Sequence, residues 1–158
     1  VEELLMSYLR NYLMNIMMRD FGEVEINRED ILEFPRGLPG FLDINEFVML
    51  PLGEKSSFII MQSVEQEDLA FITIDPACII SDYQFEIGDS IKDILQINKR
   101  EDIGVLNIVT VKDNFKEVTV NLAAPLVINF KEMLAKQVIL DREDYPVKYR
   151  LNSQKTKK

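Results

Sequence analysis

The stretch Val118–Phe130 constrains the fold more than any other part of this 158-residue chain. Val118, Val120 and Leu122 alternate with polar residues, which is the period-two pattern of a strand with one buried face. Ala123-Ala124-Pro125 then interrupts the pattern, because proline has no N–H to donate to a neighbouring strand. A second apolar run, Leu126–Phe130, follows with Asn129 inside it. This stretch therefore predicts a strand that bends at the proline.

The run just upstream, Ile103–Val111, is the most β-branched segment of the chain. A polar turn containing Asp113-Asn114 joins it to Val118, and Asp and Asn favour turns. The two runs predict a hairpin, and the residues after Ala123 predict its bent third strand. We expect these segments to form the centre of an all-β, mainly antiparallel core.

Length and composition are those of one domain with a sizeable core. No run approaches the roughly 18 uninterrupted apolar residues that a membrane-spanning helix needs, and no secretory signal pattern is seen at the start. The expectation is a soluble cytoplasmic protein. The one cysteine, Cys78, allows no internal disulfide, and between Ala77 and Ile79 it is expected to be a small buried hydrophobic residue.

The chain contains no histidine, which excludes a Ser-His or Cys-His catalyst and a histidine zinc site. Charge is distributed unevenly. Residues 18–144 hold 25 acidic and 12 basic side chains, whereas residues 145–158 hold five bases and no acid. An acidic body repels nucleic acid and attracts basic protein surfaces, although excess acid also simply maintains solubility.

The N-terminal segment Val1–Met17 differs in pattern from the rest of the chain. Its apolar residues recur at helical spacing, which predicts a short amphipathic helix: Leu4, Leu5, Tyr8, Leu9, Tyr12, Leu13 and Ile16. Met17-Met18 equally suits the start of translation, so residues 1–17 are interpreted as an extension, either helical or non-native. Residues 18–151 are predicted to form the domain, and residues 152–158 a disordered basic tail.

Further strands are predicted from alternation and turn residues: Gly22–Ile26, Ile31–Phe34, Glu46–Leu52, Ser57–Gln62, Leu69–Ile74, Asp82–Ile87 and Gln137–Leu140. Asp75-Pro76 is expected to end the fifth of these, because the residue before proline avoids the helical region. The one convincing internal helix is Asp89–Ile97, with Ile91, Ile94 and Leu95 on one face. This helix should cover an open end of the sheet.

The segment Pro35–Phe41 contains two prolines and two glycines, which predicts a rigid loop of defined shape. Leu38 and Phe41 are too apolar to remain in water. They are expected to pack onto the core or to line a groove, and packing is the commoner fate of such residues.

Catalytic signatures are absent from the pattern. There is no phosphate-binding loop, dinucleotide motif, EF-hand or serine elbow, and no basic patch interleaved with aromatic residues. Two carboxylates could serve a saccharide hydrolase. The candidate acids are Asp75 with Asp82, and Glu65 and Glu67 with Asp68, but a solvated acidic surface explains them better. The residues thus favour a binding protein with no catalytic residue, cofactor or metal.

Particular motifs resemble the flagellar assembly factor FliW family over residues 18–151. They occur in this order: Phe21-Gly22, Phe34-Pro35-Arg36-Gly37-Leu38-Pro39-Gly40-Phe41, Leu69-Ala70-Phe71, Asp75-Pro76, Asp82-Tyr83, Asn121-Leu122-Ala123-Ala124-Pro125-Leu126-Val127-Ile128-Asn129, Gln137-Val138-Ile139-Leu140 and Tyr145-Pro146-Val147-Lys148-Tyr149.

The resemblance implies a small β-barrel-like domain, capped here by one short helix, that does no chemistry. It also implies two protein partners: the carbon storage regulator CsrA, an RNA-binding translational repressor, and flagellin. In such a circuit, flagellin binds the FliW protein while it accumulates in the cytoplasm. When flagellin is exported, the free FliW protein captures CsrA. An export chaperone that binds flagellin and ignores CsrA is the alternative, and neither requires nucleic-acid or membrane binding.

Partner contacts are assigned by residue type and position in the chain. Apolar contacts are predicted at Leu38, Phe41, Phe71 and Tyr83. An acidic rim is predicted at Glu65, Glu67, Asp68, Asp75 and Asp82.

Overall fold

The computed structural model describes residues 1–5, 12–113 and 116–151. Three sequence-based expectations fall partly or wholly outside these residues: the middle of the predicted N-terminal helix, the tip of the turn after Lys112 and the disordered tail 152–158. Within the described residues, no helix is long and apolar enough to cross a membrane.

Strands make up most of the regular structure. They are β1 (Leu13–Met18), β2 (Gly22–Asn27), β3 (Leu32–Glu33), β4 (Glu46–Pro51), β5 (Phe58–Ser63), β6 (Ala70–Ile74), β7 (Ile103–Lys112), β8 (Glu117–Val120), β9 (Leu126–Asn129), β10 (Leu134–Gln137) and β11 (Tyr149–Arg150). They are joined by the short α-helix α2 (Asp89–Ile94) and by the 3₁₀ turns η1 (Arg28–Asp30), η2 (Pro76–Cys78) and η3 (Arg100–Asp102).

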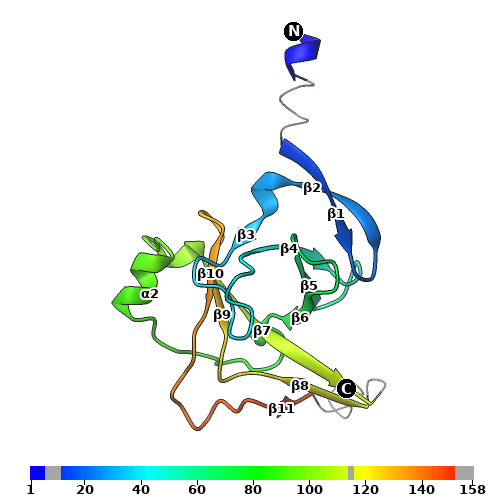
Figure 1. Cartoon of the computed structure of the whole chain (residues 1–158). Coiled ribbons are helices and arrows are strands. Elements are labelled where there is room, and N and C mark those ends of the chain that lie inside the picture. Colours follow the sequence, from blue (N-terminus) through cyan, green and yellow to red (C-terminus); the bar gives the residue numbers. More distant parts are fainter. Residues whose placement is uncertain (6–11, 114–115, 152–158) are drawn as a thin grey trace.

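Pairing between these strands forms a loosely closed barrel (Figure 1). Antiparallel pairs run in the order β7, β6, β5, β4 and β3, and β10 joins β3 to β9. The strand β9 then pairs with β7 and completes the ring. The weakest link is the parallel contact of β10 with β3, which has one residue pair, Leu134 with Glu33, supported by the bond from the Glu33 N–H to the Met133 carbonyl at 2.9 Å.

The predicted bent strand is confirmed. Both β8 and β9 lie along the same strand, β7: Thr119 opposes Thr110, and Leu126 opposes Leu106. The residues between β8 and β9 include the predicted Ala123-Ala124-Pro125 interruption, and they bulge out because they outnumber the β7 residues that face them. The predicted all-β, mainly antiparallel fold class is therefore correct.

Both faces of β9 are buried, which explains its unbroken apolar run Leu126–Ile128. Leu126 and Ile128 point into the barrel core, together with Phe34, Phe47 and Met61. Val127 points the other way and packs against Leu95 at the end of α2. Two further clusters lie outside the ring: the β1–β2 hairpin packs against Val48 of β4, and Tyr145 packs against Val109 and Val120.

The N-terminal prediction is wrong for Leu13–Met17. Residues 2–5 are helical, but Leu13–Met18 is strand β1, paired with β2. Ile16 and Met18 are buried on its inner face. The helical spacing of apolar residues overlaps here with an alternation of Met14, Ile16 and Met18, and contact with Val48 selects the strand.

Other expectations need correction too. The predicted strand Asp82–Ile87 is wrong: Asp82 lies in a turn, and residues 83–87 are outside regular structure and pair with no strand among the described residues. The predicted last strand, Gln137–Leu140, is shifted, because β10 ends at Gln137. Cys78 is exposed rather than buried, since the η2 turn instead buries Pro76.

The loop after β3 has the rigid form that its prolines and glycines predict. Its Leu38-Pro39-Gly40-Phe41 segment is a tight turn in which the Phe41 N–H donates to the Leu38 carbonyl at 2.8 Å. Gly40 has φ +87° at the third turn position, where this turn type requires glycine. Gly37 has φ +65°, and a Cβ there would lie 2.5 Å from the Leu42 carbonyl oxygen. Glycine is therefore required at residue 37 for two reasons.

Asn129 connects α2 to the barrel. Its side chain is 1% exposed, and Nδ2 donates to the carbonyls of Leu95 (2.7 Å) and Gln96 (3.1 Å) at the end of the helix. Oδ1 accepts from the N–H groups of Lys131 (3.0 Å) and Glu132 (3.2 Å). One buried amide thus satisfies four backbone groups that would otherwise lack partners.

Replacing Asn129 by alanine should lower the free energy of unfolding by about 2–4 kcal/mol, because buried carbonyls and N–H groups lose their partners. Asn98→Ala is the matched control, since Asn98 is exposed and its side chain has no hydrogen bond to the described residues. The control should stay within about 0.5 kcal/mol. Urea unfolding followed by circular dichroism measures both, and equal losses would contradict the assigned role.

Gly37→Ala should lower the free energy of unfolding by about 2 kcal/mol or more, because φ is positive and the added Cβ meets the Leu42 backbone. In the control Gly53→Ala the nearest atom lies 3.9 Å from the new Cβ, so the change should be within about 0.5 kcal/mol. Thermal unfolding of both variants provides the comparison. A Gly37→Ala protein as stable as the control would refute the steric argument.

Candidate functional site

The predicted contact residues do not form one surface. Glu65, Glu67 and Asp68 lie in the turn between β5 and β6, residues 63–69, which we call the acidic turn. Asp75 and Asp82 flank η2, beyond the opposite end of β6. At about 3.3 Å per residue, β6 separates the two groups of acids by roughly 20 Å. The predicted single acidic rim is therefore two separate groups.

The acidic turn is held from inside by Gln62, whose side chain is 1% exposed. Its Nε2 atom lies within hydrogen-bond distance of four carbonyl oxygens, those of Ser63 (3.1 Å), Gln66 (3.2 Å), Glu67 (3.0 Å) and Leu69 (3.2 Å). Its Oε1 atom accepts from the Arg19 N–H at 3.2 Å. A buried amide thus fixes the turn and ties it to the β1–β2 hairpin.

Ser63 fixes the start of the same turn. Its Oγ accepts from the N–H groups of Glu65 (3.1 Å) and Gln66 (3.0 Å), and the residue is fully buried. Glu65, Glu67 and Asp68 are exposed. The arrangement presents three carboxylates to solvent on a backbone that buried polar groups hold in one conformation.

An apolar area borders the acidic turn. The Phe41 ring lies edge-on to that of Phe71, with centroids 5.8 Å apart, and Phe71 stands near the start of β6, which the turn leads into. The Asn45 N–H also reaches Glu65 Oε1 at 3.5 Å. Phe41 is 38% exposed and Leu42 is 67% exposed. Two of the predicted apolar contacts, Phe41 and Phe71, thus lie together beside the acids.

Leu38 is placed elsewhere. It is 2% exposed and belongs to the barrel core with Phe34 and Phe47. Its assignment as a partner contact is therefore corrected: the tight turn that exposes Phe41 directs Leu38 inward, as the packing alternative expected.

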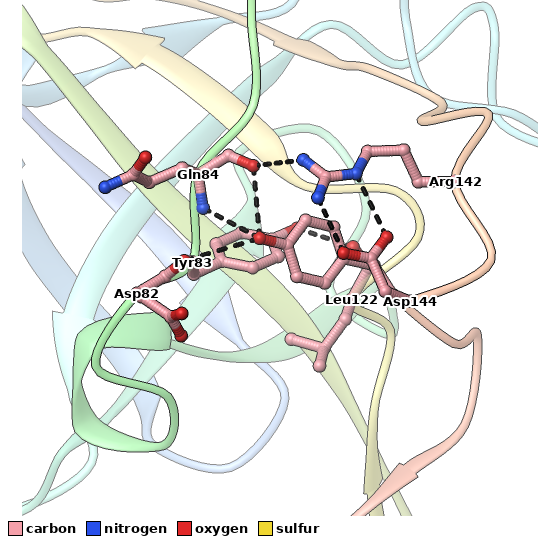
Figure 2. Close-up of polar contacts among 7 residues, drawn as sticks. Asp82, Tyr83, Gln84, Leu122, Arg142 and Asp144 are labelled. Carbon is pink, nitrogen blue, oxygen red and sulfur yellow. Dashed lines mark hydrogen bonds and ion pairs between the residues drawn. The ribbon is translucent and has the colours of Figure 1, made fainter.

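Asp75 has a structural task of its own. Its Oδ1 accepts from the Ala77 N–H at 2.9 Å and so begins η2. Asp82 is exposed, and its carbonyl oxygen lies 3.4 Å from the Tyr145 hydroxyl. Figure 2 shows the Asp82 carboxylate directed away from the neighbouring tyrosine rings.

Tyr83 joins three segments of the chain, and Figure 2 shows it together with Leu122. Its hydroxyl donates to the Leu122 carbonyl at 2.5 Å and accepts from Asn107 Nδ2 at 3.2 Å. The Tyr83 ring packs against Tyr145 at 4.6 Å between centroids. Burial raises the pKa of the Tyr83 hydroxyl, and the Asn107 hydrogen bond opposes this in part. These contacts give Tyr83 a structural role, so its hydroxyl and ring are already engaged within the protein.

Arg142 covers the same cluster. Its guanidinium lies 4.4 Å from the centre of the Tyr145 ring and donates to the Gln84 carbonyl at 2.6 Å. Two further bonds reach Asp144, at 3.0 and 2.6 Å, and these hydrogen bonds lower the pKa of the Asp144 carboxyl. Because both side chains are about half exposed, solvent screens this pair and it contributes little to stability.

A groove of about 870 Å³ beside Tyr83 carries basic residues that the sequence did not single out. Arg100 and Arg142 line it, and Lys92 and Lys99 line an adjoining groove of about 520 Å³. The adjacent Lys99-Arg100 pair was the available sequence signal in an otherwise acidic body. This side of the molecule is unlike the acidic turn in charge.

Paired carboxylates do not meet in four grooves that the described residues form. The two grooves beside Tyr83 contain Glu86, a shallow one against β1 contains Glu25, and one beside β7 contains Asp75. Each of these grooves thus holds one carboxylate residue, whereas a carboxylate-dependent hydrolase needs two facing one substrate.

Comparison with known proteins agrees with the fold. The family model described as FliW protein matches residues 15–151, so the match begins inside β1. The flagellar assembly factor FliW of Bacillus subtilis is 41% identical over 128 residues, covering 81% of this chain and 90% of the relative. That of Geobacillus kaustophilus is 42% identical over 145 residues, covering 92% and 100%.

A solved structure is similar as well. The crystal structure of a flagellar assembly factor FliW superposes with a TM-score of 0.81 at 40% identity, and covers 87% of this chain and 96% of the other. With a family match over most of its length and this shared barrel, the chain belongs to the FliW family of flagellar assembly factors.

Proposed function

We propose that this protein is a non-enzymatic cytoplasmic regulator that sequesters the repressor CsrA and is itself titrated by flagellin. Membership of a family named for flagellar assembly supports the setting. The observation that carries the CsrA part is the acidic turn, where Gln62 and Ser63 hold Glu65, Glu67 and Asp68 in fixed positions at the surface.

The physical argument rests on the partner's chemistry. A protein that binds RNA must present basic side chains to phosphates, because phosphate contacts dominate such affinity. A fixed acidic surface is attracted to that region and speeds the encounter. Once docked, it repels incoming phosphates, so antagonism requires no imitation of RNA. Fixing the backbone beforehand also lowers the entropy lost on binding.

Flagellin binding is assigned to the neighbouring apolar area. Phe41 and Leu42 are exposed beside the acidic turn. An exposed apolar surface of this kind suits the apolar face of an amphipathic helix. If flagellin uses Phe41 and CsrA uses Glu65–Asp68, the two sites adjoin. Binding of one partner then obstructs the other, which is the titration that the circuit requires.

An export chaperone that binds flagellin and ignores CsrA is the second candidate. The exposed Phe41–Leu42 area suits it equally well, whereas the fixed carboxylates have no task in it. Mixing labelled CsrA with the protein and adding flagellin distinguishes the two: displacement of CsrA supports the regulator, and absence of any CsrA complex at low salt supports the chaperone.

Neutralising the acidic turn should weaken CsrA capture. The triple variant Glu65→Gln, Glu67→Gln, Asp68→Asn keeps the backbone contacts and removes three charges, so the Kd for CsrA should rise about tenfold at low salt. The difference should shrink as salt screens the exposed charges. Titration calorimetry at several salt concentrations measures both effects.

A control triple with the same change in net charge tests position against charge. Glu54→Gln, Glu132→Gln and Glu143→Gln alter exposed acids outside the acidic turn and should change the Kd less than about threefold. Equal losses from the two triples would mean that net charge matters and the acidic turn does not. No loss from the first triple at any salt concentration would refute the assignment.

A further inference from the structure

Strand β7 is paired along one edge for most of its length but along the other for only a short part. On one side it pairs with β9 from Ile103 to Leu106 and then with β8. On the other side it pairs with β6 only from Asn107 to Val109. The edge that precedes Asn107 on the β6 side therefore has no strand beside it among the described residues.

Hydrogen bonds fix which backbone groups point to that edge. The Asn121 N–H donates to the Ile108 carbonyl, and the Phe130 N–H donates to the Asp102 carbonyl, both at 2.9 Å. Even-numbered residues of β7 therefore direct their peptide groups toward β8 and β9. Because peptide groups alternate along a strand, those of Ile103 and Val105 point to the opposite, unpaired edge.

The end of β6 has a simple cause. If β6 continued with the same register, Pro76 would oppose Val105, and proline has no N–H to donate. The chain instead forms η2, which begins at the Asp75 carboxylate and remains in contact with β7. The Ile103 N–H donates a hydrogen bond to the Arg100 carbonyl. The Ile103 carbonyl and both peptide groups of Val105 have no backbone partner among the described residues.

A groove of about 340 Å³ lies at this edge, and we call it the seam. It is mostly apolar, and its one charged residue is an acid; the main lining residues are Met49, Ile59, Asp75, Val105, Leu106 and Phe130. Phe130 is 48% exposed, and its ring covers Gly104, where a Cβ would lie too close to it. Unpaired strand backbone and an apolar pocket thus occur at one place.

We propose that the seam binds an extended segment of a partner protein, which adds to β7 as a strand and alternates apolar with basic residues. Main-chain bonds to Ile103 and Val105 give such a complex its alignment, and pockets select alternate side chains. Apolar side chains of the segment enter the pocket beside Met49 and Phe130. A basic side chain of the segment pairs with Asp75, whose Oδ1 remains bonded to Ala77.

The net charge of the chain favours a partner of opposite charge, although Ile103 and Val105 also border the 870 Å³ groove that holds Arg100 and Arg142. Each copy of this chain carries a net charge of −9, and two copies meeting at the seam would bring their Asp75 carboxylates together, which opposes self-pairing. The inference goes beyond the proposed function, because it concerns a surface at the other end of β6 and its test requires neither CsrA nor flagellin.

Amide hydrogen exchange of the free protein tests the premise. The N–H groups of Gly104 and Leu106 face β9 and should be protected, whereas the Val105 N–H should exchange at least tenfold faster. The three neighbouring residues are their own controls. Equal protection at Val105 in dilute protein would mean that the edge is already occupied and would overturn the inference, and protection that appears only at high protein concentration would make a second copy the occupant, which also overturns it.

Binding is tested with a blocked hexapeptide of alternating lysine and valine. It should bind and slow exchange at Val105. Methylating the peptide nitrogens that face β7 should weaken binding about tenfold or more, because the added strand loses its main-chain bonds. The corresponding glutamate–valine peptide should bind more weakly, by a factor that falls as salt rises.

Single substitutions test whether the peptide binds at the seam. Phe130→Ser should weaken binding about tenfold through lost apolar contact, whereas Phe21→Ser should not, although Phe21 is 49% exposed and Phe130 is 48% exposed. Asp75→Asn retains an oxygen for the Ala77 N–H and should remove the preference for lysine over glutamate. Failure of the lysine peptide to bind, binding that leaves Val105 unprotected, or equal binding of the methylated peptide would overturn the proposal. CsrA capture measured on the same samples shows whether the proposed function stands apart from it.

Discussion

Buried amide side chains that bond to loop backbone are the interaction on which this structure depends. A barrel built of short strands leaves many peptide groups at strand ends without ladder partners, and leaving such groups buried and unpaired is costly. Gln62 satisfies the acidic turn, and Asn129 satisfies the end of α2 and the turn before β10. Asn107 donates to the Asn121 carbonyl at the bulge between β8 and β9.

This arrangement has consequences for function. Loops bonded to the interior keep their shape although their outer side chains are in water, so exposed charges can occupy fixed positions. The acidic turn is the clearest case, since two buried residues bond to its backbone while its three acids remain exposed. The network is also imperfect: Oδ1 of Asn107 is buried and has no partner among the described residues. Its Nδ2 bonds hold Tyr83 and Asn121 nonetheless.

Much of the fold was accessible from the sequence, because alternation, Asp-Pro and the glycine-proline loop each act locally. Strands β2 to β9, the bend at Pro125 and the helix α2 follow from such signals, whereas β10, which joins β3 to β9, was predicted too late in the chain, at Gln137–Leu140. Asp82–Ile87 shows the limit. Tyr83, Phe85 and Ile87 are partly buried and Gln84 and Glu86 are exposed, as a strand pattern predicts, but alternation reports a buried face and not a hydrogen-bonding neighbour.

The candidate site was less accessible. Residue type indicated exposed acids and aromatic residues, and Phe41, Phe71 and the acidic turn do lie together. Residue type could not distinguish the buried Leu38, which the tight turn directs into the core, from the exposed Phe41. Nor could it place Asp75 at the far end of β6. The strand conformation of β1 depends on its contact with Val48, which is distant in the sequence. The unpaired edge of β7 depends on long-range register, which no local pattern contains.

The central claim is that capture depends on negative charge held in position, and Ser63→Ala tests it most directly. The substitution leaves every charge in place and removes the oxygen that accepts from Glu65 and Gln66. We predict amide exchange at Glu65 and Gln66 that is roughly tenfold faster, accompanied by a several-fold weaker complex with CsrA measured on the same protein. Faster exchange at both amides with unchanged CsrA affinity would contradict the account.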